Sequence, residues 1–240
     1  MASIASHLVF HPAVSQSLKL GNTTVGRDKL YRAVQNLARF LSWYYLSRGE
    51  KDPAARWTAL KSHLASARKL LRLGKPVEHL QAALRASTAP GPALEQVTAA
   101  GRQLAYFLYL SYDAFVWANS VKLYTLTPDT AEKVAKRSNR FWLAGIILSI
   151  VNSFIKASRI RREVKAGRHL TTSEKVSTTK QALKATDAAT RHQLTMDLLD
   201  LWLPATALNL VNIPDGVVGI LGFTTSVMAL RKQWGTLGGK

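Results

Sequence analysis

Six basic residues and no acidic residue lie between Pro53 and Val77. Trp57, Leu60 and Leu64 repeat there at steps of three and four, which predicts one apolar face of an α-helix. At about 100° per residue the apolar positions fill a sector roughly 80° wide, and the charges border that sector. Such a helix can lie on an anionic bilayer with its basic heads at the lipid phosphates. The predicted membrane-binding residues are Arg56, Trp57, Leu60, Lys61, Leu64, Arg68, Lys69, Leu71, Arg72 and Lys75.

The alternative for this segment is a helix that packs on a protein core and keeps a solvated basic rim. Surface helices of soluble proteins mix both signs of charge, so the absence of acid favours the anionic phospholipid membrane. The net charge of +19 also implies an acidic partner, which is nucleic acid, anionic lipid or an acidic protein. Nucleic acid is disfavoured because two uncharged apolar runs follow, Phe141 to Ile155 and Val217 to Leu230.

Patterns that support catalysis or metal binding are missing from the sequence. The six histidines are scattered, and no pair of carboxylates has a catalytic spacing. Gly21 and Gly26 have the spacing of a phosphate-binding loop, but Arg27 and Asp28 stand where that loop needs lysine and serine or threonine. The chain has no cysteine, which excludes disulfides and thiol chemistry. We therefore expect no enzyme activity, no cofactor and no metal.

The fold that positions these residues is predicted to be all-α. We expect a helical membrane protein with amphipathic interfacial helices and short apolar helices in the C-terminal half. Residues 1–127 are predicted to form an amphipathic membrane-remodelling region, and 128–240 a membrane-embedded region with a basic connector at 156–193. The part of the connector at 156–184 is interpreted as a mobile loop or a fraying helix end. Three-and-four spacing predicts helices over 24–48, 54–73, 77–85 and about 93–124. The last of these is interpreted first as a packed or interfacial helix and second as a membrane span.

Phe141 to Ile155 is the strongest candidate for a membrane span. Its fifteen uncharged residues rise only about 22 Å, so the flanking Arg140 and Lys156 must reach toward the headgroups to cross a ~30 Å core. A buried core helix is the alternative. A second candidate span covers 216–234, and Pro204 is expected to bend the apolar run before it. Small residues let helix backbones approach in lipid, and the predicted oligomer contacts are Gly145, Ser149, Ser153, Gly219, Gly222 and Ser226.

Four short segments have a distinctive sequence: Gly26 to Arg32, Arg68 to Pro76, Tyr112-Asp113 with Trp117, and Leu201 to Pro204. Together they resemble the peroxin-eleven family of peroxisomal membrane-elongation proteins. The resemblance covers nearly the whole chain. The segment Arg68 to Pro76 is similar to the family's amphipathic segment and is the most specific of the four.

The resemblance implies a place in the peroxisomal membrane and a role in elongating it into tubules before fission, which controls peroxisome number. It further implies self-association, a fission adaptor and a dynamin-like GTPase as partners, and both chain ends in the cytosol. Some members are proposed instead to form a pore for small metabolites. For that alternative the candidate lining groups are Asp113, Asn119, Asn152, Asp200 and Asn209.

Overall fold

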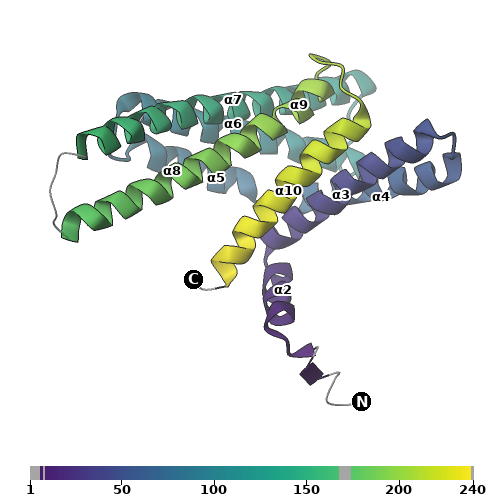
Figure 1. The fold of residues 1–240 in the computed structure, drawn as a ribbon. Helices are drawn as coiled ribbons and strands as arrows, with labels where there is room; N and C mark the ends of the chain where they lie inside the picture. Colours follow the sequence, from purple (N-terminus) through teal and green to yellow (C-terminus); the bar gives the residue numbers. More distant parts are fainter. Residues whose placement is uncertain (1–5, 8, 168–173, 239–240) are drawn as a thin grey trace. The chain divides into compact units, whose positions relative to one another are not determined.

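The computed structural model describes residues 6–7, 9–167 and 174–238, and every regular element in these residues is an α-helix (Figure 1). The all-α prediction is therefore confirmed. The helices are α2 (Pro12–Asn22), α3 (Thr24–Ser47), α4 (Lys51–Leu71), α5 (Lys75–Ser87), α6 (Ala93–Ser120), α7 (Pro128–Gly167), α8 (Glu174–Asp200), α9 (Trp202–Ala207) and α10 (Asp215–Leu237).

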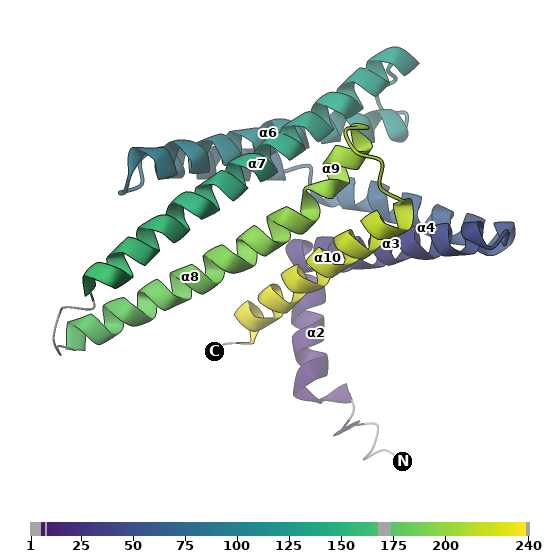
Figure 2. The same ribbon diagram turned by 45° about the horizontal axis from the view of Figure 1, so that its top comes forward.

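The helices form two compact units whose division differs from the predicted boundary at 127/128. The first unit joins the chain up to Leu71 with the chain from Ile213 onward, so it contains α2, α3, α4 and α10. The second unit runs from Arg72 to Asn212 and contains α5 to α9. In the first unit α3 and α4 form a helical hairpin, and α10 packs on α3 (Figures 1 and 2). In the second unit α7 packs on both α6 and α8.

The ends of α3 are set by local sequence. The Thr23 hydroxyl accepts a hydrogen bond from the N–H of Gly26 at 2.9 Å and caps the first turn. At the other end Gly49 adopts φ +79°, and the N–H of Glu50 bonds the Tyr45 carbonyl at 3.0 Å, which completes a Schellman motif. The helix predicted over 24–48 is confirmed.

The interpretation of residues 156–184 as a loop or fraying helix end is wrong for the residues described. α7 continues to Gly167 and α8 begins at Glu174, while residues 168–173 lie outside the described part of the chain. The break after α8 agrees with the expected bend at Pro204. A proline ring clashes with the carbonyl four residues earlier, and α8 ends at that residue, Asp200.

Tertiary contacts hold the last turns of α7, which is why composition alone misjudged them. Arg159 Nε donates to Glu95 Oε1 of α6 at 2.7 Å, and its terminal nitrogen donates to Glu163 at 2.8 Å. Ile160, one residue further, is only 3% exposed. A basic stretch that looks frayed in isolation is therefore anchored by an ion pair to a different helix.

The buried positions of both units are mostly small or polar, and large apolar side chains face outward. Buried polar and charged residues include Asp28, Arg32, Asn36, Ser42, Glu95, Thr98, Asp113, Ser149, Asn152, Asp197 and Thr225. Exposed apolar residues include Leu30, Val34, Leu37, Leu94, Val97, Phe115, Ile147, Val151, Phe154, Val217, Ile220 and Val227. In water, both the burial of polar groups and the exposure of large apolar side chains would be unfavourable. Helices packed in lipid use small and polar contacts in this way, so the burial pattern is that of a membrane-embedded bundle.

Among the described residues one helix is long and apolar enough to cross a membrane, the Pro128–Lys165 part of α7, with a mean hydropathy of 1.5 in its most apolar window. Only 28% of that window is buried, whereas the core helix of a soluble protein is mostly buried. This low burial supports a span that contains Phe141 to Ile155. The same criteria do not select α10, which carries the other predicted span.

The close approach of α10 to α3 generates a prediction. A Cβ on Gly219 would lie 2.8 Å from the backbone nitrogen of Phe40 and 2.9 Å from the carbonyl oxygen of Asn36, whereas nothing lies within 4 Å of a Cβ on Gly235. We expect Gly219→Leu to cost about 1–3 kcal/mol by overpacking and to lower the unfolding temperature of the purified protein in detergent, followed by helical circular dichroism. Gly235→Leu, on the same helix, should leave that temperature nearly unchanged. Equal midpoints for the two variants would contradict the packing.

Candidate membrane-interaction surface

α4 packs on α3 through small and polar side chains. Ala54 is 4% exposed, and the hydroxyls of Thr58 and Ser42 share a hydrogen bond at 2.6 Å. Further along the helix, Arg68 Nε donates to Asp28 Oδ1 of α3 at 3.0 Å. At about 100° per residue positions 54, 58 and 68 fall on one side of α4, which is the side that faces α3.

The apolar stripe of α4 lies about 100° around the helix from the α3-facing side. Trp57, Leu60 and Leu64 each come one residue before a position on the α3-facing side, and one residue turns the helix by about 100°. All three side chains are half-buried. The packing of α4 on α3 therefore does not cover the apolar stripe. The stripe stays partly exposed beside the polar contact between α3 and α4.

Lys61 and Arg39 converge on Asp215, the first residue of α10. Arg39 Nε donates to Asp215 Oδ1 at 2.9 Å, and Lys61 Nζ lies 3.6 Å from Oδ2. Burial acts to raise the pKa of Asp215, but the Arg39 hydrogen bond and the charges of Arg39 and Lys61 outweigh it, so the net shift is downward. The carboxylate also stands at a helix N-terminus, where negative charge is favoured.

Arg72, just beyond the end of α4, is bound to α6. One terminal nitrogen donates to Asp113 Oδ2 at 2.7 Å, and the other donates to the Tyr109 hydroxyl at 3.1 Å. The side chains of Arg72 and Asp113 are only 17% and 10% exposed. A guanidinium held in this way by a carboxylate and a phenol can stay away from water, which an isolated one could not.

The remaining predicted membrane-binding residues are placed as follows. Arg56 is exposed, Lys69 and Leu71 are half-buried, and Lys75 Nζ contacts Glu78 Oε2 at 2.7 Å. The structure thus gives Lys61, Arg68, Arg72 and Lys75 carboxylate partners inside the chain. Their binding to lipid headgroups stays a prediction.

Sequence reasoning missed those carboxylate partners. One signal was available, because Asp113 is the only charged residue between Arg102 and Lys122. A lone carboxylate in an apolar helix needs a cation, and Arg72 supplies it. For Asp28 no such signal exists, since it stands among basic residues in the sequence.

The small residues predicted as oligomer contacts on α7 pack inside the chain. A Cβ on Gly145 would lie 3.2 Å from the ring of Tyr106, and the Ser149 hydroxyl donates to Asp197 of α8. Ser153 is 4% exposed. These positions bring α7 close to α6 and α8, as small residues do between helices in lipid. Their role between copies stays a prediction.

The second predicted set of oligomer contacts lies on the α10 face that meets α3. A Cβ on Gly222 would collide with the amide oxygen of Asn36, and Gly219 approaches the α3 backbone. The Ser226 side chain is fully buried, and its hydroxyl donates to the Gly222 carbonyl. This set likewise has its packing partner within the chain, and its use in self-association stays a prediction.

Buried polar side chains connect α6, α7 and α8. The Asn152 amide donates to the Thr98 hydroxyl at 2.7 Å and to the Glu95 carbonyl at 3.0 Å. Gln193 donates to Asp197 at 2.9 Å, and Ser149 donates to the same carboxylate. In the described part of the chain no group of three or more histidine, aspartate or glutamate residues is arranged to hold a metal ion. The polar groups are used to join helices.

The chain is similar in sequence to a family of known proteins. The family model described as Peroxisomal biogenesis factor 11 (PEX11) matches residues 14–234. The chain is 27% identical to Peroxisomal membrane protein PMP30A of Candida boidinii and 27% identical to Peroxisomal membrane protein PMP27 of Saccharomyces cerevisiae. In both cases the match covers 96% of this chain and 98% of the relative.

A third relative is Peroxisomal biogenesis factor 11 of Schizosaccharomyces pombe, which is 23% identical over 93% of this chain and 96% of its own length. No solved structure matches the chain. The similarity therefore extends over whole chains on both sides and includes both compact units.

The buried Arg72–Asp113 pair can be tested by removing its cation. Arg72→Gln leaves the Asp113 carboxylate without this partner, and breaking a buried pair costs about 3–5 kcal/mol. We expect a clearly lower unfolding temperature of the purified full-length protein in detergent. Lys133→Gln is the control, because its pair with Asp129 is 64% and 73% exposed and such pairs contribute about 0–1 kcal/mol. The interpretation fails if the two variants shift the midpoint equally.

Proposed function

The chain belongs to the Peroxisomal biogenesis factor 11 family of peroxisomal membrane proteins, and we propose that it elongates and curves the peroxisomal membrane before fission. In this proposal the α3–α4 hairpin inserts into one leaflet, with the apolar stripe of α4 entering the acyl boundary. The result is control of peroxisome number through membrane shape.

The observation that supports this proposal is the inverted burial of the first unit. On α3 the outward side chains are Leu30, Val34 and Leu37, which are 36–46% exposed, while Asp28 and Asn36 are buried. α10 has the same arrangement, with large apolar residues outside and glycines inside. A hairpin with this pattern is more stable in the acyl boundary than in water.

The internal ion pairs explain how a basic helix can sit below the headgroups. A bare guanidinium in lipid is costly, but Arg68 is neutralised by Asp28 and Lys61 approaches Asp215. Arg56 is exposed and has no recorded hydrogen bond or ion pair among the described residues, so it is the cation we assign to lipid phosphate. Each such contact contributes roughly 1 kcal/mol.

Curvature needs more than one inserted hairpin. A wedge in one leaflet expands that leaflet and favours convex bending, but a single helix has a small effect. We therefore propose that copies self-associate on the anionic phospholipid surface and concentrate their wedges. The fission adaptor and the dynamin-like GTPase belong to the same proposal as the machinery that acts after elongation.

A metabolite pore is the rival function, and the uses of three of its five candidate lining groups weigh against it. Asp113 binds Arg72, Asn152 joins α7 to α6, and the Asn119 side chain accepts from the N–H of Leu126. Polar groups that are paired within the bundle do not line an aqueous path. Conductance of the purified protein in planar bilayers would favour the pore, whereas tubulation without conductance would favour the wedge.

The wedge predicts that Leu60→Glu with Leu64→Glu abolishes tubulation of liposomes rich in phosphatidylglycerol by the full-length protein, seen by negative-stain electron microscopy. Two carboxylates on the apolar stripe oppose insertion and are repelled by the anionic surface. The matched control is Ala59→Glu with His63→Glu, which puts two carboxylates at the same spacing on the exposed far side of α4. Tubules with the stripe variant, or loss of tubules in both variants, would refute insertion of the stripe.

A further inference from the structure

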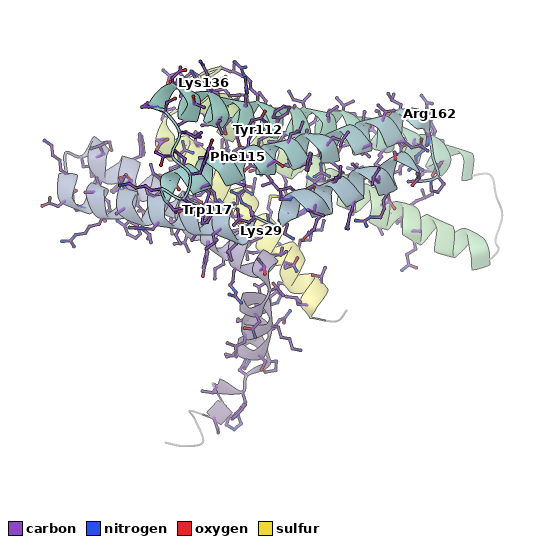
Figure 3. All side chains as sticks on the ribbon, turned by 180° about the vertical axis from the view of Figure 1, so that it is seen from behind. Lys29, Tyr112, Phe115, Trp117, Lys136 and Arg162 are labelled. Atoms are coloured by element: carbon purple, nitrogen blue, oxygen red, sulfur yellow. The ribbon has the colours of Figure 1, made fainter. Side chains whose placement is uncertain are left out.

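A groove of about 360 Å³ lies in the second unit, between the first half of α7 and the turn that follows α9. This volume falls within the range of small-ligand pockets, ~300–1,000 Å³. Figure 3 labels Lys136 on the part of α7 that borders it, and Arg162 near the opposite end of the same helix. The lining residues are Lys136, Arg140, Leu143, Ile147, Leu208 and Leu210, with Ala144 and Asn209 between them.

The apolar wall opposite α7 is fixed by the C-terminal cap of α9. Asn209 adopts φ +58°, its N–H bonds the Thr206 carbonyl at 3.0 Å, and the N–H of Leu210 bonds the Ala205 carbonyl at 3.0 Å. These are the two hydrogen bonds of a Schellman motif. The cap therefore holds Leu208 and Leu210 beside α7, although Leu210 is 64% exposed.

The other end of the groove is basic. Lys136 and Arg140 are four residues apart and therefore lie on one side of α7. Lys136 Nζ contacts Glu132, so part of its charge is compensated. Arg140 is exposed, and no hydrogen bond or ion pair is recorded for it within the described residues. The groove thus offers an uncompensated guanidinium at one end and leucine and isoleucine side chains at the other.

The position of the groove along α7 matches the two parts of a lipid. Arg140 immediately precedes the uncharged run Phe141 to Ile155. In the span predicted for this run, the basic end of the groove stands where the run meets the headgroup layer. Leu143 and Ile147 follow at the depth of the acyl chains. Ile147 is 48% exposed, which is unfavourable in water and acceptable beside hydrocarbon.

We propose that this groove binds one anionic glycerophospholipid of the surrounding bilayer. Its phosphate accepts hydrogen bonds from Arg140 and Lys136, and one acyl chain lies against Leu143, Ile147 and Leu210. A free phosphate would use the basic end and leave the apolar wall open to water. A lipid without a phosphate would use the wall and leave Arg140 without an anion. Phosphatidylcholine would bring its phosphate but also a quaternary ammonium, which Arg140 and Lys136 repel. Only an amphiphile with both parts satisfies the whole groove.

The experiment is native mass spectrometry of the full-length protein, released from nanodiscs that contain equal amounts of phosphatidylglycerol and phosphatidylcholine. We expect one retained phosphatidylglycerol per chain. Lys136→Gln with Arg140→Gln should lower its retention by about thirtyfold, the factor for two basic residues near an anionic headgroup. Unchanged retention in this double variant would overturn the proposal.

The chain offers a closely matched control in the preceding positions of the same helix. Lys133→Gln with Arg137→Gln removes the same two charges at the same spacing, and Lys133, like Lys136, contacts a carboxylate four residues earlier. Neither residue lines the groove. We expect retention to stay within about twofold of the unmodified protein. A loss equal to that of the groove variant would show a diffuse charge effect and overturn a defined site.

A third variant tests the apolar half without altering charge. Ala144→Phe places a ring in the groove and should displace the acyl chain. Lipid retention should therefore fall about as much as in the double variant. Full retention would exclude the acyl-chain contact and overturn the proposal. Displacement of the lipid by millimolar inorganic phosphate would also overturn it. The readout is bound lipid rather than tubulation, so this result is independent of the wedge in α4.

Discussion

Helices in lipid cannot be held together by burying hydrocarbon, because lipid tails are as apolar as leucine. The structure is organised around that constraint. Close glycine and serine contacts bring α10 to α3 and α7 to α6 and α8, and polar side chains join the helices where the backbones approach. Arg68–Asp28, Arg72–Asp113 and Arg159–Glu95 add buried or half-buried ion pairs. The large apolar side chains are left for the bilayer.

Sequence patterns were sufficient to predict the apolar runs and most of the helices, because both depend on local spacing. The last turns of α7 and the start of α8 were the exception. The helix over 24–48, the apolar stripe of Trp57, Leu60 and Leu64, and the break before Pro204 all follow from short-range rules. The contacts between helices could not be predicted from local spacing. A helical wheel places Arg68 at the edge of a stripe, but it cannot indicate that Asp28, forty residues earlier, accepts its hydrogen bond. For the same reason the sequence did not indicate that Gly145 packs against α6 and Gly219 against α3.

Two of the ion pairs, Arg68–Asp28 and Arg72–Asp113, fall within the segments that resemble the family. Asp28 belongs to the segment Gly26 to Arg32, both arginines belong to Arg68 to Pro76, and Asp113 follows Tyr112. These segments are therefore connected by polar contacts as well as by sequence likeness. Arg68 serves the first unit and Arg72 the second, one helical turn later. A motif that looks purely amphipathic thus contributes one buried ion pair to each of two separate sets of helices.

The first unit draws its helices from both ends of the chain. Asn36 of α3 is 5% exposed, and Gly222 of α10 lies against its amide. While the chain is being synthesised, α3 and α4 leave the ribosome well over a hundred residues before α10 does. Until then the Asn36 carboxamide, which donates to the Arg32 carbonyl of its own helix at 2.9 Å, lacks the close packing of Gly222. The first unit therefore cannot close until α10 has been synthesised, whereas all the helices of the second unit precede α10 in the chain.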